Sequence, residues 1–195
     1  MKTLEVPTAD EAIAILSQHV EEGYLLHGSP RPDLMVLEPQ KSTALQVDTD
    51  TGDVVPNQHV LCATEHPVPA IFYATVQGPA TDASLYRATG VKGKDSEGDF
   101  QYFANEDAKG LVRTRLAHRI LSFVYFGNRE DFSFSLELGH WMSHSPTPIT
   151  GKLAVSATCL PFNVFDLRSP DSDPDIRRYH EREIIVRNRS CNANC

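Results

Sequence analysis

The residues best suited to chemistry are His27, Gly28 and Ser29, which directly follow the apolar run 24–26. Such a run predicts a short buried strand, with the histidine at its carboxyl end, where a ligand can be met. Gly28 would let the backbone approach another group closely or take a positive φ. A hydrogen-bonded core histidine is the alternative interpretation.

A second pair, Glu181 and Glu183, lies in the expected last strand, 179–187. Alternation along a strand puts both carboxylates on one side, about 7 Å apart. Two acids facing one site would suit catalysis. A solvent-facing edge strand is the alternative explanation of the pair.

Two pairs of neighbouring elements would position His27, Gly28 and Ser29: a helix followed by a strand, and a strand followed by a helix. The Thr8–Glu11 segment is a capping box that starts a helix ending at Gly23, directly before the histidine strand. Residues 60–64 form a second short strand, and Pro67 suits the first turn of the following helix. Between the two pairs, residues 29–57 read as a long loop with one apolar patch at 34–37.

The remainder indicates a mixed α+β domain with mainly antiparallel pairing. Asn105 would cap a helix, and the other expected strands are 122–126, 132–136, 153–155 and 162–167. We expect one domain over residues 1–190 and a polar, cysteine-containing tail over 191–195.

Composition narrows the function classes. Of the 195 residues, 41% are hydrophobic, and the formal net charge is −8. The negative charge disfavours nonspecific attraction to nucleic acid or to an anionic membrane. The sequence has neither a signal-peptide core nor a long apolar run, so we expect a cytoplasmic protein. The cysteines are too few and too unevenly spaced for a disulfide framework.

Other chemistries have weaker patterns. His140 and His144 would share a face only in a helix, and Pro146 follows them, so we expect no metal site. Cys62 could pair with His27 or His66 as a thiol nucleophile, but its apolar neighbours favour a buried cysteine.

Taken in order, these features resemble the ADP-ribosyltransferase superfamily, in particular its poly(ADP-ribose) polymerase and diphtheria-toxin-like branch. The resemblance is carried by residues 25–29 (LLHGS), by 61–64 (LCAT) followed by 70–73 (AIFY), and by Glu181 or Glu183; the close part covers about residues 23–77. It implies a split, mainly antiparallel sheet with few helices.

The resemblance also implies NAD as co-substrate. His27 would bond a ribose hydroxyl and the Gly28 backbone would hold the nicotinamide amide. Ser29 and Thr64 would complete the donor site, and Phe72 or Tyr73 would stack on the nicotinamide ring.

The carboxylates would serve the reacting centre. Cleavage of the nicotinamide–ribose bond passes through an oxocarbenium-like sugar, which a nearby negative charge stabilises. The resemblance gives this role to Glu183, with Glu181 as the alternative or as the residue that orients the acceptor.

Three further interpretations stay open. Leu61 and Ala70 stand where the family usually has a tyrosine and often a serine, so a noncatalytic module that binds a nucleotide, ADP-ribose or a protein is one alternative. An NAD glycohydrolase, with water as acceptor, is another. An RNA 2′-phosphotransferase-type relative would need more basic residues. The acceptor itself is not specified by the sequence.

Overall fold

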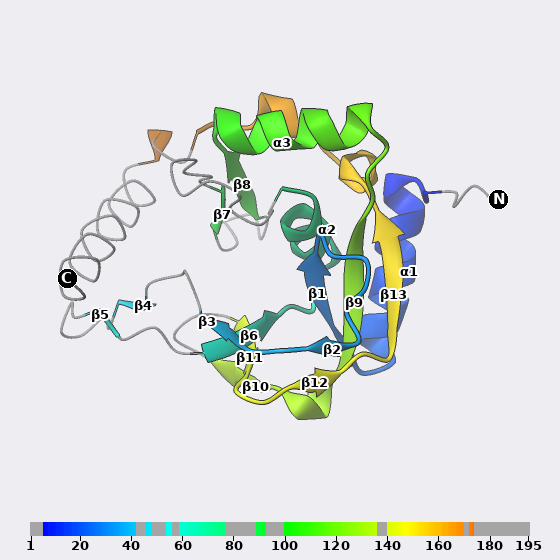
Figure 1. Cartoon of the computed structure of the whole chain (residues 1–195), viewed down its shortest axis with the longest axis vertical. Helices are drawn as coiled ribbons and strands as arrows, with labels where there is room; N and C mark the ends of the chain where they lie inside the picture. The colour runs from blue at the N-terminus through cyan, green and yellow to red at the C-terminus, as the bar shows by residue number, and fades with distance from the viewer. Residues whose placement is uncertain are drawn as a thin grey trace.

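The computed structural model describes residues 6–41, 46–47, 54–55, 59–76, 89–92, 100–135, 140–169 and 172–173. Its centre is an antiparallel sheet of order β1-β9-β13, formed by Tyr24–Ser29, Ser122–Asn128 and Gly151–Val155. Figure 1 shows these strands side by side, with α1 beside β13 and α3 across the top. Helices and antiparallel sheets together make this an α+β structure, as the sequence predicts.

The first helix, α1 (Ala9–Glu21), forms as its capping box predicts. The Thr8 hydroxyl accepts a hydrogen bond from Glu11 N–H at 3.3 Å, and the Glu11 carboxylate accepts one from Thr8 N–H at 2.9 Å. Gly23 takes a φ of +96°, which glycine adopts without strain. That turn leads the chain directly from α1 into β1.

A second antiparallel sheet lies across the lower end of the first (Figure 1). Its order is β10-β11-β6-β3, formed by Ser133–Ser135, His140–Ser143, His59–Ala63 and Gln40–Lys41. Shorter pairs are β2 (Val36–Leu37) with β12 (Thr147–Pro148), β4 (Gln46–Val47) with β5 (Val54–Val55), and β7 (Thr89–Lys92) with β8 (Gln101–Ala104).

Each face of the first sheet packs on its own apolar cluster. On one face, Leu26, Val124 and Val155 pack with α1, α2 (Pro67–Val76) and α3 (Glu106–Ala117). On the other face, Leu25 and Tyr125 pack with residues of β2 and β6. Adjacent residues of β1 therefore serve two different cores, which accounts for the burial of both Leu25 and Leu26.

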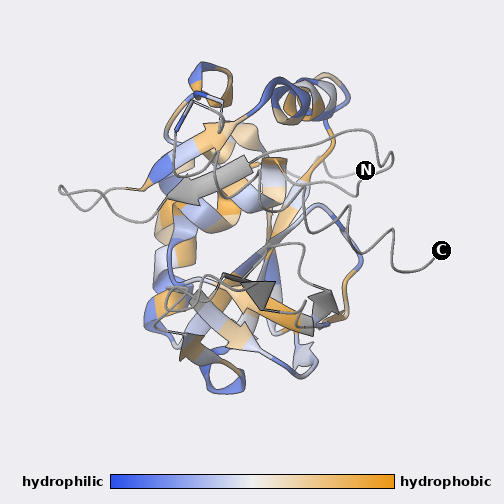
Figure 2. Ribbon diagram, turned by 90° about the vertical axis from the view of Figure 1, so that its left-hand side faces the viewer, coloured by the Kyte–Doolittle hydropathy of each residue, from blue (hydrophilic) through white to orange (hydrophobic). Residues whose placement is uncertain are grey.

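The helices differ in polarity. In α2 the apolar residues occur all round the helix, and most are buried, because it packs on both β1 and α3. Helix α3, capped by Asn105, is largely hydrophilic, and Figure 2 shows it nearly end-on at the top. None of the described helices has the length and apolar character needed to cross a membrane.

Several local predictions need correction. The segment 162–167 is not a strand: it holds the short 3-10 helix η3 (Val164–Asp166), because the Asn163 side chain accepts a hydrogen bond from Phe165 N–H at 3.2 Å. Residues 29–57 are not a structureless loop, since they contain β2 to β5. Two more 3-10 helices are η1 (Arg129–Asp131), between β9 and β10, and η2 (Ala157–Cys159).

Candidate functional site

The two sheets part beside His27. Leu26 joins them through an isolated bridge, in which its N–H and C=O both bond Thr64 at 2.9 Å. In an antiparallel ladder the next such pair would be Gly28 with Cys62. Instead, the carbonyl oxygen of Cys62 lies 2.8 Å from His27 Nδ1. The His27 side chain has thus taken the place of a backbone pair, and the ladder stops there.

Where the sheets part, the backbone groups of Gly28 are left outside the strand pairing. Successive residues of a strand direct their N–H and C=O groups to alternate sides, so Gly28 presents both groups to the same edge as Leu26. Neither group has a hydrogen-bond partner among the described residues. One donor and one acceptor therefore lie next to His27 at the split between the sheets.

Gly28 is also required by the packing of α2. A Cβ at this position would lie 2.3 Å from Ala70 O and 2.6 Å from Ala74 N. Of the two reasons that the sequence offers for this glycine, close approach is therefore the one observed, and the partner is a helix backbone. The contact fixes β1 against α2 directly beside the split between the sheets.

The environment of His27 favours the neutral imidazole. Burial lowers the pKa of His27 below its ordinary value of 6.5, and the hydrogen bond to the Cys62 carbonyl opposes that shift. A carbonyl only accepts, so Nδ1 must carry the proton and Nε2 holds a lone pair. His27 is thereby set to accept a hydrogen bond from a hydroxyl group.

The other predicted donor-site residues take different places. Ser29 is 7% exposed, and its Oγ accepts a hydrogen bond from Arg31 N–H at 3.3 Å. Thr64 is half-buried in the bridge to Leu26, and its Oγ1 accepts one from His66 N–H at 3.1 Å. Both lie close to His27 in the chain or across the bridge.

The two aromatic candidates on α2 are not equivalent. Phe72 has no exposed surface, and its ring centroid lies 5.0 Å from that of Tyr102 and 6.3 Å from that of Phe162. Tyr73 is only half-buried. Of the two rings, only that of Phe72 is therefore fully enclosed.

The two positions that depart from the family pattern are both buried. Leu61 is 3% exposed in the cluster between the sheets, and Ala70 is 1% exposed against Gly28. Cys62 is exposed, contrary to its sequence interpretation as a buried residue, because its side chain points away from that cluster. Surrounding protein nevertheless raises the pKa of its thiol, which makes a thiolate nucleophile harder to form.

Some candidates cannot be placed. Glu181, Glu183 and the expected strand 179–187 lie outside the described residues. The zinc interpretation of His140 and His144 required a helix, whereas residues 140–143 form β11. Within the described ranges, no group of three or more His, Cys, Asp or Glu is arranged to hold a metal ion.

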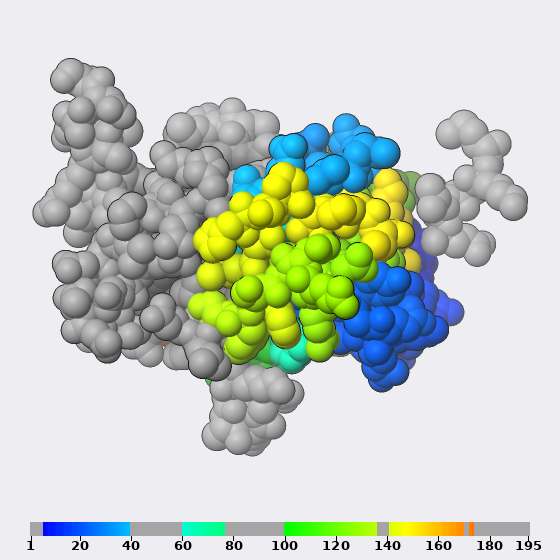
Figure 3. All heavy atoms as spheres, turned by 90° about the horizontal axis from the view of Figure 1, so that it is seen from below, coloured from blue at the N-terminus to red at the C-terminus, as the bar shows by residue number. Residues whose placement is uncertain are grey.

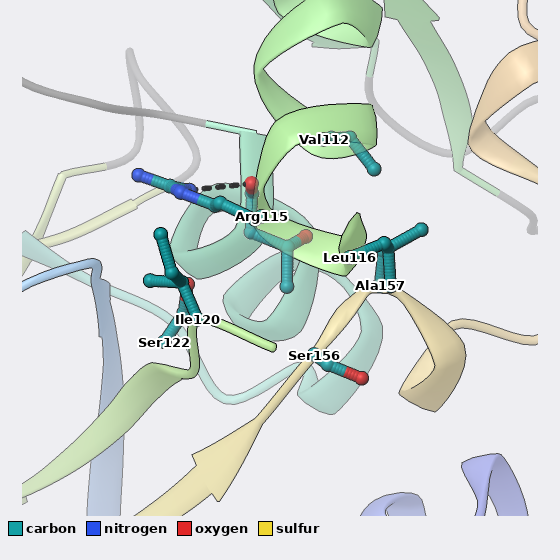
Figure 4. A pocket seen from close by; sticks show the side chains of 8 residues that line it. Val112, Arg115, Leu116, Ile120, Ser122, Ser156 and Ala157 are labelled. Atoms are coloured by element: carbon teal, nitrogen blue, oxygen red, sulfur yellow. Dashed lines mark hydrogen bonds between the residues drawn. The ribbon is translucent and has the colours of Figure 1, made fainter. Parts of the chain in front are cut away.

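Two cavities lie elsewhere, near α3. One, of about 10 Å³, is lined by Arg115 and neighbouring residues of β9 and η2; in Figure 4 the Arg115 guanidinium points to the end of α2. The other, a groove of about 380 Å³, runs between α3 and residues 157–165. Neither is lined by His27, Gly28 or Ser29.

Sequence reasoning missed Tyr125. It is the β9 residue directly opposite His27, and it has no exposed surface. The aromatic alternation of 122–126 predicts a strand there, but not which residue faces His27. Comparisons of the chain with protein-family models, curated proteins and solved structures found no match to any of them.

Proposed function

We propose that this protein binds NAD, cleaves its nicotinamide–ribose bond and transfers ADP-ribose to an acceptor. The observation that carries the proposal is that a neutral His27 lies next to the Gly28 backbone groups, which have no hydrogen-bond partner among the described residues, at the split between two sheets. The resemblance of residues 23–77 to the ADP-ribosyltransferase superfamily supports the same assignment.

The Gly28 edge is complementary to a carboxamide. A primary amide offers one acceptor oxygen and N–H donors in one plane, so it can bond the Gly28 N–H and C=O as a neighbouring strand would. The nicotinamide group of NAD is such an amide. This pairing orients the leaving group beside β1.

His27 then serves the adjoining sugar. Its Nε2 lone pair accepts a hydrogen bond from a ribose hydroxyl, while the Cys62 carbonyl holds the ring through Nδ1–H. Of the two aromatic candidates, Tyr73 is the one left to stack on nicotinamide. Ser29 and Thr64 support the site through the backbone that they bond.

The reaction breaks the bond between ribose C1′ and the nicotinamide nitrogen. The bonding electron pair leaves with nicotinamide, which departs neutral, and the sugar becomes an oxocarbenium-like cation. Glu183 stabilises that cation and takes the proton that the acceptor loses when it attacks C1′. Glu181 is the alternative for this role, or it orients the acceptor; with water as acceptor the activity is that of a glycohydrolase.

The test is release of nicotinamide from NAD by the purified protein, followed by chromatography. We expect His27→Ala and Glu183→Gln to abolish most of the release. His144→Ala and Glu130→Gln, which change exposed residues, are the matched controls and should retain it. Release that is equal in all variants, or absent from the wild type, would overturn the transferase assignment.

A second candidate is a noncatalytic module that binds NAD or ADP-ribose. The buried Leu61 and Ala70 favour it, since neither side chain offers a polar group to the nicotinamide. Calorimetry separates the two candidates: such a module binds NAD with normal affinity in Glu183→Gln and releases no nicotinamide in any variant.

A further inference from the structure

Three residues form a row on the face of the first sheet that lies away from α2. His27 pairs with Tyr125 across β1 and β9, and Tyr125 pairs with Lys152 across β9 and β13. Side chains of directly paired residues lie on the same face of a sheet. The row therefore extends from the candidate site to the outer strand.

The hydroxyl of Tyr125 holds the chain that follows Ser29. It donates a hydrogen bond to Arg31 O at 2.5 Å and accepts one from Leu34 N–H at 3.4 Å. Burial raises the pKa of this phenol, which keeps the donated proton in place. One buried side chain thus fixes both sides of the turn after the histidine strand.

Lys152 holds the same segment at the next strand. Its Nζ donates a hydrogen bond to Pro32 O, and the ammonium lies 4.9 Å from the ring centroid of Phe123 and 5.8 Å from that of Tyr125. Beyond these contacts, β2 pairs with β12. In Figure 3 the light-blue surface of this segment borders the yellow surface of residues 140–155.

The contacts of Tyr125 and Lys152 hold residues 30–34 over β9 and β13. This segment crosses β9 toward β13, whereas the backbone N–H and C=O of Gly28 face β6. Figure 1 likewise shows the chain turning from the end of β1 toward β9 before it returns as β2. Residues 30–34 therefore leave the Gly28 edge open.

We propose that Tyr125 and Lys152 are positioning residues that hold residues 30–34 clear of the Gly28 edge, so that the site is formed before the dinucleotide binds. This inference rests on the proposed function, because it names NAD as the molecule served. A segment that is already held costs no ordering entropy on binding. Loosening it should weaken binding without changing the chemical step.

The first measurement is amide hydrogen exchange in the NAD-free protein. Tyr125→Phe removes only the hydroxyl, and we expect the Leu34 amide to exchange about tenfold faster, as for the loss of one hydrogen bond. Lys152→Met removes the ammonium but keeps an apolar stem, while Lys152→Arg keeps a cationic donor and should preserve wild-type exchange. Tyr24→Phe, at a half-buried tyrosine whose hydroxyl bonds no described residue, is the matched control.

The second measurement is the kinetics of nicotinamide release by the same variants. We expect Tyr125→Phe and Lys152→Met to raise the KM for NAD about tenfold with kcat within about twofold of wild type, because uniform binding is lost. Lys152→Arg should restore the KM. A purely structural role would change neither parameter in the correctly folded variants.

The outcomes separate the inference from the function. Unchanged Leu34 exchange in Tyr125→Phe, or faster exchange with an unchanged KM, overturns the positioning role while the transferase stands. A wild type that neither binds nor cleaves NAD overturns the proposed function, and the link to NAD falls with it. In that case the exchange rates alone still decide whether Tyr125 and Lys152 hold this segment.

Discussion

His27 Nδ1 donates a hydrogen bond to the carbonyl oxygen of Cys62 at 2.8 Å, an acceptor that continued strand pairing would have given to Gly28. A single side chain thereby ends a ladder, leaves the Gly28 backbone groups without a hydrogen-bond partner among the described residues, and fixes its own tautomer. The free energy of unfolding should also depend on pH, because the histidine in this hydrogen bond is kept neutral by burial.

The free energy of unfolding should decrease as the pH is lowered through the range in which His27 titrates. Its pKa in the folded protein is below the ordinary 6.5, so between these values the unfolded chain binds a proton that the folded protein does not. The stabilisation is complete above about pH 6.5 and is lost as the pH falls toward the folded pKa, with a slope of at most about 1.4 kcal/mol per pH unit.

Urea unfolding of the wild type, His27→Gln and His144→Gln at several pH values checks this expectation. His27→Gln should lack this component of the pH dependence, whereas His144→Gln, at an exposed position, should retain it. Identical pH dependence in the wild type and His27→Gln would refute the burial of a neutral His27.

Gly28→Ala should destabilise the fold because the new methyl group would meet the backbone of α2 at 2.3 Å. We expect a loss of about 1–3 kcal/mol from overpacking. Gly110→Ala is the matched control: this glycine lies in α3 with no atom within 4 Å of the added Cβ, so the change should stabilise by about 0.5–1 kcal/mol. Thermal or urea unfolding measures both, and equal effects would contradict the contact.

Arg115 should stabilise the folded protein by donating hydrogen bonds to carbonyl groups in the last turn of α2. Its Nη1 donates hydrogen bonds to Thr75 O at 2.6 Å and Ala74 O at 3.3 Å, in the last turn of the helix, where backbone carbonyls lack partners within the helix (Figure 4). Arg115→Met should cost about 2–3 kcal/mol.

The matched control for Arg115 is Arg113→Met, since Arg113 lies on the same helix with its side chain 59% exposed. That change should cost less than about 1 kcal/mol. Urea unfolding gives both values, and similar losses would show that the α2 carbonyls are not what Arg115 stabilises.

Thiol accessibility should distinguish Cys62 from Cys159. Cys62 is exposed, whereas Cys159 has no exposed surface and its Sγ donates to Pro7 O at 3.3 Å. Iodoacetamide should therefore alkylate Cys62 in the native protein, and Cys159 only after unfolding. The rate at Cys62 should rise with pH, because its raised pKa leaves little thiolate at neutrality. Peptide mapping by mass spectrometry reads both sites, and native labelling of Cys159 would contradict its burial.

Local patterns were sufficient for the elements around the site. The capping box before α1, the apolar run of β1, Pro67 at the start of α2 and the Asn105 cap of α3 all act within a few residues. Such short-range contacts are readable from sequence because they depend on neighbours along the chain. The strand prediction at 162–167 was wrong because the Asn163 side chain accepts a hydrogen bond from the nearby Phe165 N–H and turns the chain.

The sequence by itself therefore determined the helices, the strand that carries His27 and the α+β class. Only the tertiary structure decided that the ladder stops at Cys62, that Gly28 meets α2, and that Phe72 is fully buried whereas Tyr73 is half-buried. These features depend on the register between strands 35 residues apart and on which helix face meets the sheet. Neither is encoded in the spacing of neighbouring residues, since both are settled when distant segments pack together.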